Sequence, residues 1–313
     1  MVTRSRSGAD AGPPGERSGS LIGTELGLWF ERNGRDLPWR RSRDPWAVLV
    51  AEAMLQQTQV ERVVPRWWSF LDRFPDPPTC AAAPVADVIT EWAGLGYNRR
   101  AVNLHRTATV VAADHGGRLP ATLDDLLALP GVGPYTARAV LVFAFEADEA
   151  VVDTNVGRIL ARVGGRRLGP AAAQAEAERN LPPGRAWTWN QALLDVGAGW
   201  CTARGPRCGS CPLRSRCRWA RAGRPDPDPA TGSAAVSGRQ APFAGSDRQG
   251  RGRLVEALRR GPVAIDSLAV VMGWPDQPGR AAAVAELVVD DGLASVDGDR
   301  LVLPGRGAPA PRP

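Results

Sequence analysis

The sequence contains no lysine, so all 39 of its basic residues are arginines. A chain without lysine cannot form a Schiff base through a lysine amine, which excludes that form of covalent catalysis. No apolar run is long enough to span a bilayer. The polar, arginine-bearing residues 1–20 also lack the apolar centre of a signal peptide. We therefore expect a cytoplasmic protein with a disordered leader and no contact with membranes.

Acidic residues are outnumbered by basic ones, 33 against 39, which gives the chain a net charge of +6. A basic balance favours a polyanionic partner, and arginine makes planar, bidentate contacts with phosphate. The abundance of alanine, glycine, proline and arginine indicates codon bias. That bias explains why arginine replaces lysine, but it does not explain the excess of positive charge.

Cysteine is scarce, and four of the five residues are clustered at Cys201, Cys208, Cys211 and Cys217, with Cys80 apart. In a reducing compartment such a cluster indicates a metal site before a disulfide framework. The spacing C-x6-C-x2-C-x5-C, filled with proline, glycine and arginine, is typical of a tight loop whose thiolates close around one metal centre. Spacing alone leaves structural zinc, an iron–sulfur cluster and unrelated thiols open.

Apolar periodicity of about 3.6 residues runs through the first 220 residues, where strands are scarce, and predicts an all-α fold. The predicted helices cover about 25–39, 46–59, 61–73, 84–92, 99–114, 122–129, 134–146, 155–163, 171–180 and 187–199.

The region after residue 220 changes in composition. Residues 221–249 are rich in Pro, Asp, Ser, Gly and Ala, which predicts a linker. Three further helices (about 251–260, 265–272 and 280–291) and a hairpin around Asp297-Gly298 predict a small winged-helix-like domain over 250–304. Residues 305–313 are expected to form a disordered tail.

Glu52 is the one polar residue in the apolar stretch from Ala47 to Leu55. On a helix it has aliphatic neighbours one turn before and after it. A carboxyl group in that setting is poorly solvated when ionised, so its pKa should rise toward neutrality, as a general acid requires. A surface glutamate at the polar edge of the helix is the alternative on this segment alone.

Three other segments contain candidate site residues. Gln56, Gln57, Thr58 and Gln59 continue the predicted helix and suit the reading of base edges, or form a solvated helix end. Asp153 precedes a helix and predicts an N-cap, which is compatible with a carboxylate fixed beside a sugar. The glycines of Leu129-Pro-Gly-Val-Gly133 allow a hairpin whose backbone approaches a phosphate closely, or an ordinary helix–helix turn.

Together these features resemble the helix–hairpin–helix glycosylase superfamily, and within it the MutY-type adenine glycosylases. The resemblance covers about residues 24–220. Its motifs are LPWR (37–40), EAMLQQTQ (52–59), GLGY (94–97), NLH (103–105), LPGVGPYT (129–136), VDTNV (152–156), NQA (190–192) and the four cysteines. It implies a glycosylase domain over 21–220. Within that domain, a six-helix region covers about 40–155, and an iron–sulfur region over 156–220 packs with the N-terminal helix.

The resemblance also implies a reaction. A monomer would flip adenine, mispaired with 8-oxoguanine or guanine, out of double-stranded DNA at the nucleoid, as a step of base excision repair. Glu52 would protonate the base and Asp153 would stabilise the cationic sugar. A [4Fe–4S] cluster would be bound by the four cysteines.

The resemblance gives each remaining residue a role as well. Tyr135 and Asn155 would hydrogen-bond near the two acids. Gln57 and Tyr97 would act as wedges, which insert into the gap left by the extruded base and into the minor groove. The further DNA and base contacts would come from Trp39, Arg40, Gln56, Thr58, Leu129, Gly131, Val132, Gly133, Gln191 and Asp195.

Tyr135 stands where the related endonuclease III enzymes have a lysine, so a monofunctional enzyme without lysine-based lyase activity is expected. Two departures from the family pattern matter. Thr154 replaces the usual glycine between Asp153 and Asn155. The 64 residues from 250 onward are too few and too helical for the Nudix-like domain that senses 8-oxoguanine in many relatives. That shortfall puts the preference for adenine opposite 8-oxoguanine in doubt, unless it arises elsewhere.

Two other functions stay open. One is a glycosylase for thymine or uracil in G mismatches, because some relatives share a tyrosine at position 135. The other is a non-catalytic iron–sulfur module that binds DNA. The run from Leu55 to Gln59 favours adenine, and the presence of both acids argues against a non-catalytic module.

Overall fold

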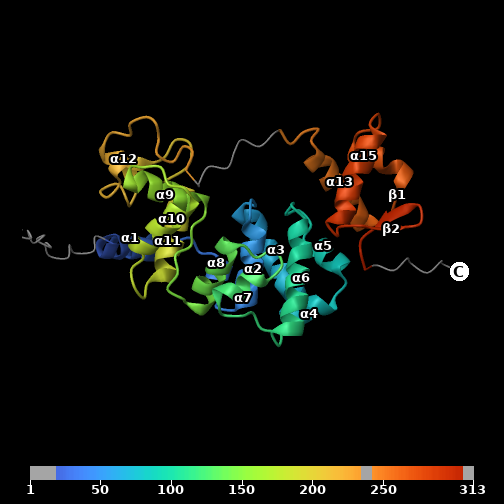
Figure 1. Ribbon diagram of the computed structural model, residues 1–313, viewed down its shortest axis with the longest axis horizontal. Coiled ribbons are helices and arrows are strands. Elements are labelled where there is room, and N and C mark those ends of the chain that lie inside the picture. Colours follow the sequence, from blue (N-terminus) through green and yellow to red (C-terminus); the bar gives the residue numbers. More distant parts are fainter. Residues whose placement is uncertain (1–18, 234–241, 306–313) are drawn as a thin grey trace, which may run out of the picture.

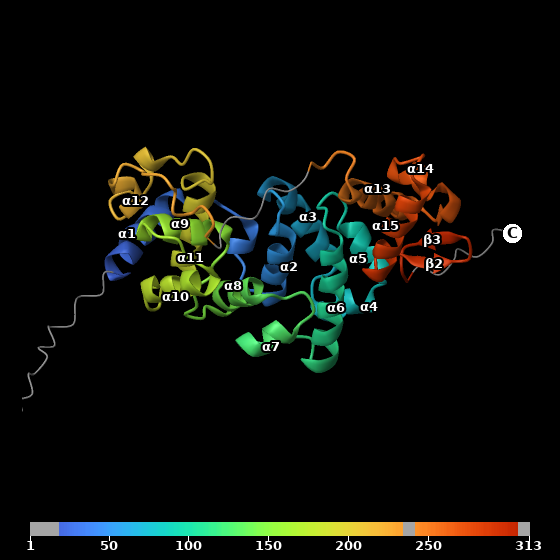
Figure 2. The same cartoon turned by 45° about the horizontal axis from the view of Figure 1, so that its top comes forward.

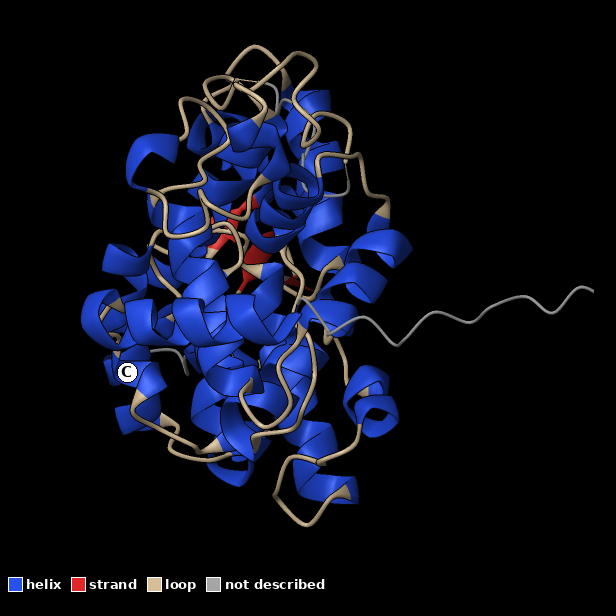
Figure 3. Ribbon diagram, turned by 90° about the vertical axis from the view of Figure 1, so that its left-hand side faces the viewer, coloured by secondary structure: helices blue, strands red, loops and turns tan. Residues whose placement is uncertain are grey.

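The computed structural model describes residues 19–233 and 242–305. The predicted leader up to residue 18, the predicted tail from residue 306 and residues 234–241 of the predicted linker lie outside the described residues. Helices dominate the described part, and short strands form one small sheet (Figure 3). No helix within this part is both long and apolar enough to cross a bilayer.

The elements fall into three consecutive groups. The first is α1 (Gly19–Asn33), η1 (Pro38–Arg40), α2 (Pro45–Leu55), α3 (Val60–Arg73), α4 (Pro77–Ala82), α5 (Val85–Glu91), α6 (Arg99–Asp114), α7 (Leu123–Ala128) and α8 (Pro134–Phe145). The second is α9 (Thr154–Gly164), α10 (Pro170–Asn180), α11 (Ala186–Gly199), η2 (Cys208–Ser210) and α12 (Arg218–Arg221). The third is α13 (Asp247–Arg260), β1 (Val263–Ala264), η3 (Ile265–Ser267), α14 (Leu268–Met272), α15 (Pro278–Asp290), β2 (Ser295–Asp297) and β3 (Arg300–Val302).

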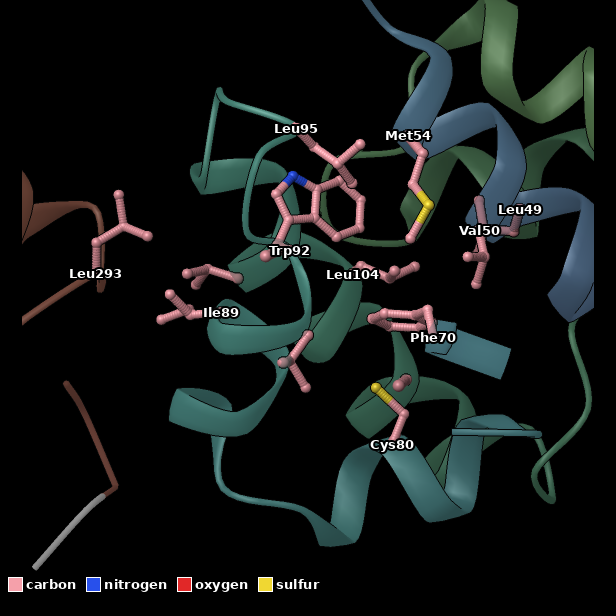
Figure 4. Close-up of a cluster of buried hydrophobic side chains, with 14 of the residues drawn as sticks. Leu49, Val50, Met54, Phe70, Cys80, Ile89, Trp92, Leu95, Leu104 and Leu293 are labelled. Carbon is pink, nitrogen blue, oxygen red and sulfur yellow. The ribbon is translucent and has the colours of Figure 1, made fainter. Parts of the chain in front are cut away.

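Helix α2 lies at the centre of the first group, between α3, α6 and α8 (Figure 1). The Asp44 carboxylate caps its N-terminus by accepting from the N–H groups of Trp46 and Ala47. Apolar side chains cover almost the whole circumference of the helix, so it can be stable only in the interior. Val50 and Met54 pack there with Phe70 (Figure 4).

Helix α2 ends at Leu55, four residues before the predicted end. Gln56 leaves the helix with ψ of 108°, and Gln57 adopts a left-handed φ of 58°. The Thr58 N–H then closes a turn on the Leu55 carbonyl at 3.2 Å. The glutamines therefore form a loop and not the predicted continuation of the helix, because polar side chains gain nothing from following an apolar helix into the core.

The second group packs with the N-terminal helix, since α1 contacts α10 and α11. Part of the predicted linker folds back onto this group. Asp228 forms a salt bridge with the nearly buried Arg162 at 2.6 Å, and the Ser233 hydroxyl accepts from the Leu168 N–H at 3.1 Å. Residues 225–233 are thus attached to the body, a correction that the polar composition of the segment could not reveal.

The third group forms a compact unit of helices and a three-stranded antiparallel sheet in the order β1–β3–β2 (Figure 2). The β2–β3 hairpin turns at the predicted Asp297-Gly298, whereas the two-residue β1 was not predicted. The unit lies against the first group, because α13 contacts α5 and the Ala86 N–H donates to the Pro304 carbonyl at 3.1 Å. Leu293 extends the shared apolar core on the side of Ile89 (Figure 4).

Candidate active site and cysteine loop

A cavity of about 1020 Å³ lies where η1, α2, α8, α9, α10 and α11 meet. Its wall includes most of the residues that the sequence predicts for catalysis and base contact. These are Trp39, Arg40, Glu52, Gln56, Gln57, Thr58, Tyr135, Asp153, Asn155 and Gln191. Folding therefore brings together side chains as far apart in the sequence as Trp39 and Gln191.

Glu52 lies in the wall of this cavity with only 6% of its surface exposed, so its predicted burial is confirmed. Burial raises the pKa of Glu52 to about 7. A hydrogen bond from the Tyr135 hydroxyl and the charge of Arg40 lower this pKa, and the nearby Asp153 raises it. Near neutral pH about half of the Glu52 carboxyl groups therefore hold a proton that they can transfer.

Tyr135 owes its place beside Glu52 to the turn between α7 and α8. Gly131 has φ of 76°, and a Cβ atom there would lie 2.7 Å from the Cβ of Asn103, so the tight turn requires glycine. The Thr107 hydroxyl fixes the turn by donating to the Pro130 carbonyl at 2.7 Å. Pro134 begins α8, and Tyr135 follows in its first turn. The predicted helix–hairpin–helix is thus present.

Asp153 is the N-cap of α9, as predicted, because its Oδ1 accepts from the Val156 N–H at 2.7 Å. The amide of Asn155 donates to the other oxygen at 2.8 Å. Burial raises the pKa of Asp153 above its usual range, while these hydrogen bonds and the charge of Arg158 lower it. The donors favour the ionised form of Asp153, whereas burial favours the protonated form.

Arg158 fixes the orientation of the Asn155 side-chain amide. Arg158 donates from Nη2 to Asn155 Oδ1 at 2.7 Å, and a guanidinium can only donate, so the Asn155 NH₂ group must face Asp153. The same Arg158 donates to the Gly197 carbonyl at 2.9 Å and to the Cys201 carbonyl at 2.6 Å. Helices α9 and α11 and the start of the cysteine loop are therefore held together with Asp153.

Asp195 does not line the cavity, although the sequence analysis expected it there. It is 2% exposed and accepts from Arg40 at 2.7 and 2.9 Å and from the Arg35 side chain at 2.7 Å. Two guanidinium groups neutralise the carboxylate, and hydrogen bonds with both lower its pKa. Its position shows that Asp195 orients Arg40, which does lie in the wall. A carboxylate on an otherwise apolar helix face does not reveal which partner will cover it.

Tyr97 also lies outside this cavity and lines a second one of about 310 Å³. Gln56 and Gln57 take part in both walls and so separate the two spaces. Tyr97 and Gln57 both have left-handed backbones, with φ of 45° and 58°, which is strained for residues with a Cβ atom. Such strain is typical of functional loops, and here both residues are expected wedges.

Several residues of the cavity wall were not predicted, among them Arg35, Arg138 and Gln174. Arg138 stands one helical turn after Tyr135 and pairs with Glu149 at 3.4 Å, so its spacing from Tyr135 was the available signal. Gln174 comes from α10 and donates to the Ala150 carbonyl at 2.9 Å. Nothing in the local sequence of α10 indicates that the helix reaches this site.

All four clustered cysteines line one small cavity, together with Ile159, Trp200, Leu213 and Trp219 among others. The sulfur of Cys201 accepts from Arg162 at 3.4 Å, and that of Cys217 accepts from the Ala220 N–H at 3.4 Å. Within residues 19–233 and 242–305, no three Cys, His, Asp or Glu side chains are grouped tightly enough to share one metal ion. The loop thus gathers four sulfurs around an apolar space without forming a single-ion site.

Residues 50–183 match the family described as HhH-GPD superfamily base excision DNA repair protein. The fold and the paired acids thus define a helix–hairpin–helix protein of base excision DNA repair. An adenine DNA glycosylase of Mycolicibacterium smegmatis is 42% identical over 294 residues, which cover 92% of this chain and 98% of that relative. The chain belongs to the adenine DNA glycosylase family.

Solved structures agree with this assignment of the fold. A thermostable thymine-DNA glycosylase superimposes with a TM-score of 0.62 at 30% identity, covering 65% of this chain and 97% of that one. A non-covalent endonuclease III–DNA complex gives 0.56 at 25% identity, covering 65% and 95%. The predicted all-α helix–hairpin–helix class is therefore confirmed.

Proposed function

We propose that this protein hydrolyses the N-glycosidic bond of adenine mispaired with 8-oxoguanine or guanine in double-stranded DNA. The observation that carries the proposal is the pair of acids in one cavity, Glu52 with a pKa of about 7 and Asp153 held by N–H donors. Membership of the adenine DNA glycosylase family supports the choice of base. We also propose that the protein acts as a monomer on the nucleoid in the cytoplasm.

The two acids would have different catalytic roles because their environments differ. An extruded adenine in the cavity would receive the proton of Glu52 on a ring nitrogen and become a better leaving group. Tyr135 orients that carboxyl group through its hydroxyl. As the glycosidic bond breaks, positive charge develops on the sugar and Asp153 stabilises it. Water then adds to the sugar carbon, which leaves an abasic site and free adenine.

The protein would hold DNA on both sides of the cavity. The backbone N–H groups of Gly131 and Gly133 in the turn before α8 would bind a phosphate without reading sequence, because those of Leu129 and Val132 already donate to the Leu126 and Leu129 carbonyls. Gln57 would fill the gap that the extruded base leaves, and Tyr97 would insert beside it. Trp39, Arg40 and Gln191 line the space that would receive the base.

A set of duplexes that differ in one pair tests the proposal directly. We expect release of free adenine from A·8-oxoguanine and A·G duplexes, measured by chromatography of the released base, and no release of thymine from T·G. The structural similarity to a thymine-DNA glycosylase makes T·G the informative alternative. Thymine release without adenine release would overturn the proposed substrate. Tight binding without release of either base would indicate a non-catalytic DNA-binding module.

We propose that the cysteine loop binds a [4Fe–4S] cluster and not zinc, because all four cysteines line one cavity and membership of the family supports this cofactor. A cluster of iron and sulfide is larger and takes four thiolates around its outside. When bound, it would fix the loop that contains the exposed Arg204, Arg207 and Arg214, which suits contact with a DNA backbone.

Replacing Cys208 by serine should abolish the visible absorption of the purified protein and reduce its solubility, because one of the four ligands is lost. The matched control is Cys80→Ala, which alters a buried cysteine in the core around Phe70, far from the loop in sequence. Absorption spectra and iron analysis of both variants provide the measurement. An unchanged spectrum in Cys208→Ser would refute the assignment of the cluster.

A further inference from the structure

The C-terminal unit is fixed to the body through Arg259 of α13. This side chain is 9% exposed and donates to the Ile89 carbonyl at 3.1 Å and to Asn98 Oδ1 at 2.8 Å. Asn98 follows Tyr97 directly, so the C-terminal unit holds the loop that presents Tyr97. The apolar residues Leu254, Val255 and Leu258 of the same helix join the core of the body.

Two turns before Arg259, the same helix contributes Arg251 to the second cavity. Arg251 is 28% exposed and pairs with Asp291, which is 20% exposed and also pairs with Arg99 at 3.3 Å. The cavity is lined by Gln56, Gln57, Tyr97, Asn98, Arg99, Arg100, Asn103, Arg251 and Asp291. Two elements of the C-terminal unit therefore complete a space that the body alone leaves open.

The location of this space indicates what enters it. Gln56 and Gln57 separate it from the cavity that holds Glu52 and Asp153. When a base is extruded from a duplex, its former partner stays unpaired on the other side of the wedge. The volume of about 310 Å³ lies within the usual range of ligand pockets, about 300–1,000 Å³.

We propose that Arg251 and Asp291 of the C-terminal unit form, with Tyr97 and Gln57, a subsite that reads the purine opposite the excised base. This inference rests on the proposed glycosylase function and assigns its opposite-base specificity. Guanine presents the acceptors N7 and O6 on its major-groove edge, which an arginine reads with two hydrogen bonds. 8-Oxoguanine instead carries a proton on N7 and a further carbonyl at C8. An arginine beside an aspartate offers the donor and the acceptor that this edge requires.

The rest of the C-terminal unit is poorly suited to contact DNA. The β2–β3 turn contains Asp297 and Asp299, and the Asp299 side chain is 88% exposed, which would repel phosphate. Helix α15 buries Ala281, Val284, Ala285 and Val288 within the unit. The exposed face of α15 contains Ala282, Ala283, Glu286 and Leu287 and no basic residue, whereas Arg251 faces the wedge loop.

Binding to three duplexes tests the subsite, with adenine placed opposite 8-oxoguanine, guanine or an abasic analogue. All measurements use fluorescence anisotropy on proteins that also contain Glu52→Gln, so that the duplex stays intact. We expect Arg251→Gln to weaken binding roughly tenfold when a purine is opposite and to leave the abasic duplex unchanged. Asp291→Asn should narrow the preference for 8-oxoguanine over guanine. Arg260→Gln is the matched control, because Arg260 lies on the same helix but lines a hollow with Phe243 and Val271.

Equal weakening on all three duplexes would overturn the inference, since it would indicate contact with the phosphate backbone alone. No weakening in either variant would overturn it as well. Thermal unfolding shows whether the Arg251→Gln variant folds. If it does not, the Asp291→Asn variant provides the test, because asparagine keeps the shape of the aspartate in the pair. The proposed function fails separately, when the protein with Glu52 intact releases no adenine.

Discussion

Replacing Glu52 by glutamine should lower the rate of adenine release by roughly a hundred- to ten-thousandfold, the usual contribution of a general acid, and leave binding to the mismatched duplex intact. Glutamine has nearly the same shape but no acidic proton to transfer. Single-turnover base release and anisotropy provide the two measurements. Glu61→Gln is a matched control, because Glu61 is exposed on α3. Undiminished release by Glu52→Gln would refute the assignment of the acid.

The dependence on pH gives the same prediction a second readout. The protonated form of Glu52 predominates below a pKa of about 7, so release should slow about tenfold per pH unit above that value. The folded-state pKa lies above the ordinary 4.5, so the folded protein loses stability as pH rises from 4.5 to 7, by roughly 3 kcal/mol. Glu52→Gln should therefore unfold at a higher temperature than the parent at pH 8, and the difference should shrink at pH 5.

Replacing Asp153 by asparagine should slow release by on the order of a hundred- to a thousandfold, as expected when one stabilising charge is removed beside a developing cation. Asparagine caps helices about as well as aspartate, so α9 should keep its start and the protein its fold. The loss would then be due to charge and not to unfolding. Rapid-quench kinetics and thermal unfolding give the two quantities.

Asp44→Asn is the control for this variant, because Asp44 caps α2 through two backbone N–H groups and does not line the active cavity. Both variants should change the unfolding temperature by a similar small amount, but only Asp153→Asn should lose activity. A comparable loss of activity in both variants would mean that a weakened helix cap, and not the lost charge of Asp153, lowers the rate.

The match to the Mycolicibacterium smegmatis relative covers 92% of this chain and 98% of that protein, so it includes most of the small C-terminal unit. In this chain Arg259 and Leu293 fix the unit against α5 and the Tyr97 loop. A unit of fewer than 70 residues can therefore contribute to the site through a few side chains at its interface.

The sequence by itself determined the helical class, the hairpin at Leu129 to Gly133, the burial of Glu52 and the cap at Asp153. Each of these depends on local chemistry: apolar periodicity, a glycine with a left-handed backbone, aliphatic neighbours one turn away and a carboxylate before a helix. Such signals lie within a few residues of one another, so they can be recognised without the fold.

Only the tertiary structure decided where α2 ends, that Asp195 holds Arg40, and that Gln174 reaches the cavity. It also decided that Asp228 folds back onto Arg162 and that Arg251 lies beside Tyr97. The two ion pairs among these contacts join residues 155 and 66 positions apart. Their free energy comes from partners that local propensity does not specify, because charge pairing and burial depend on which helices meet.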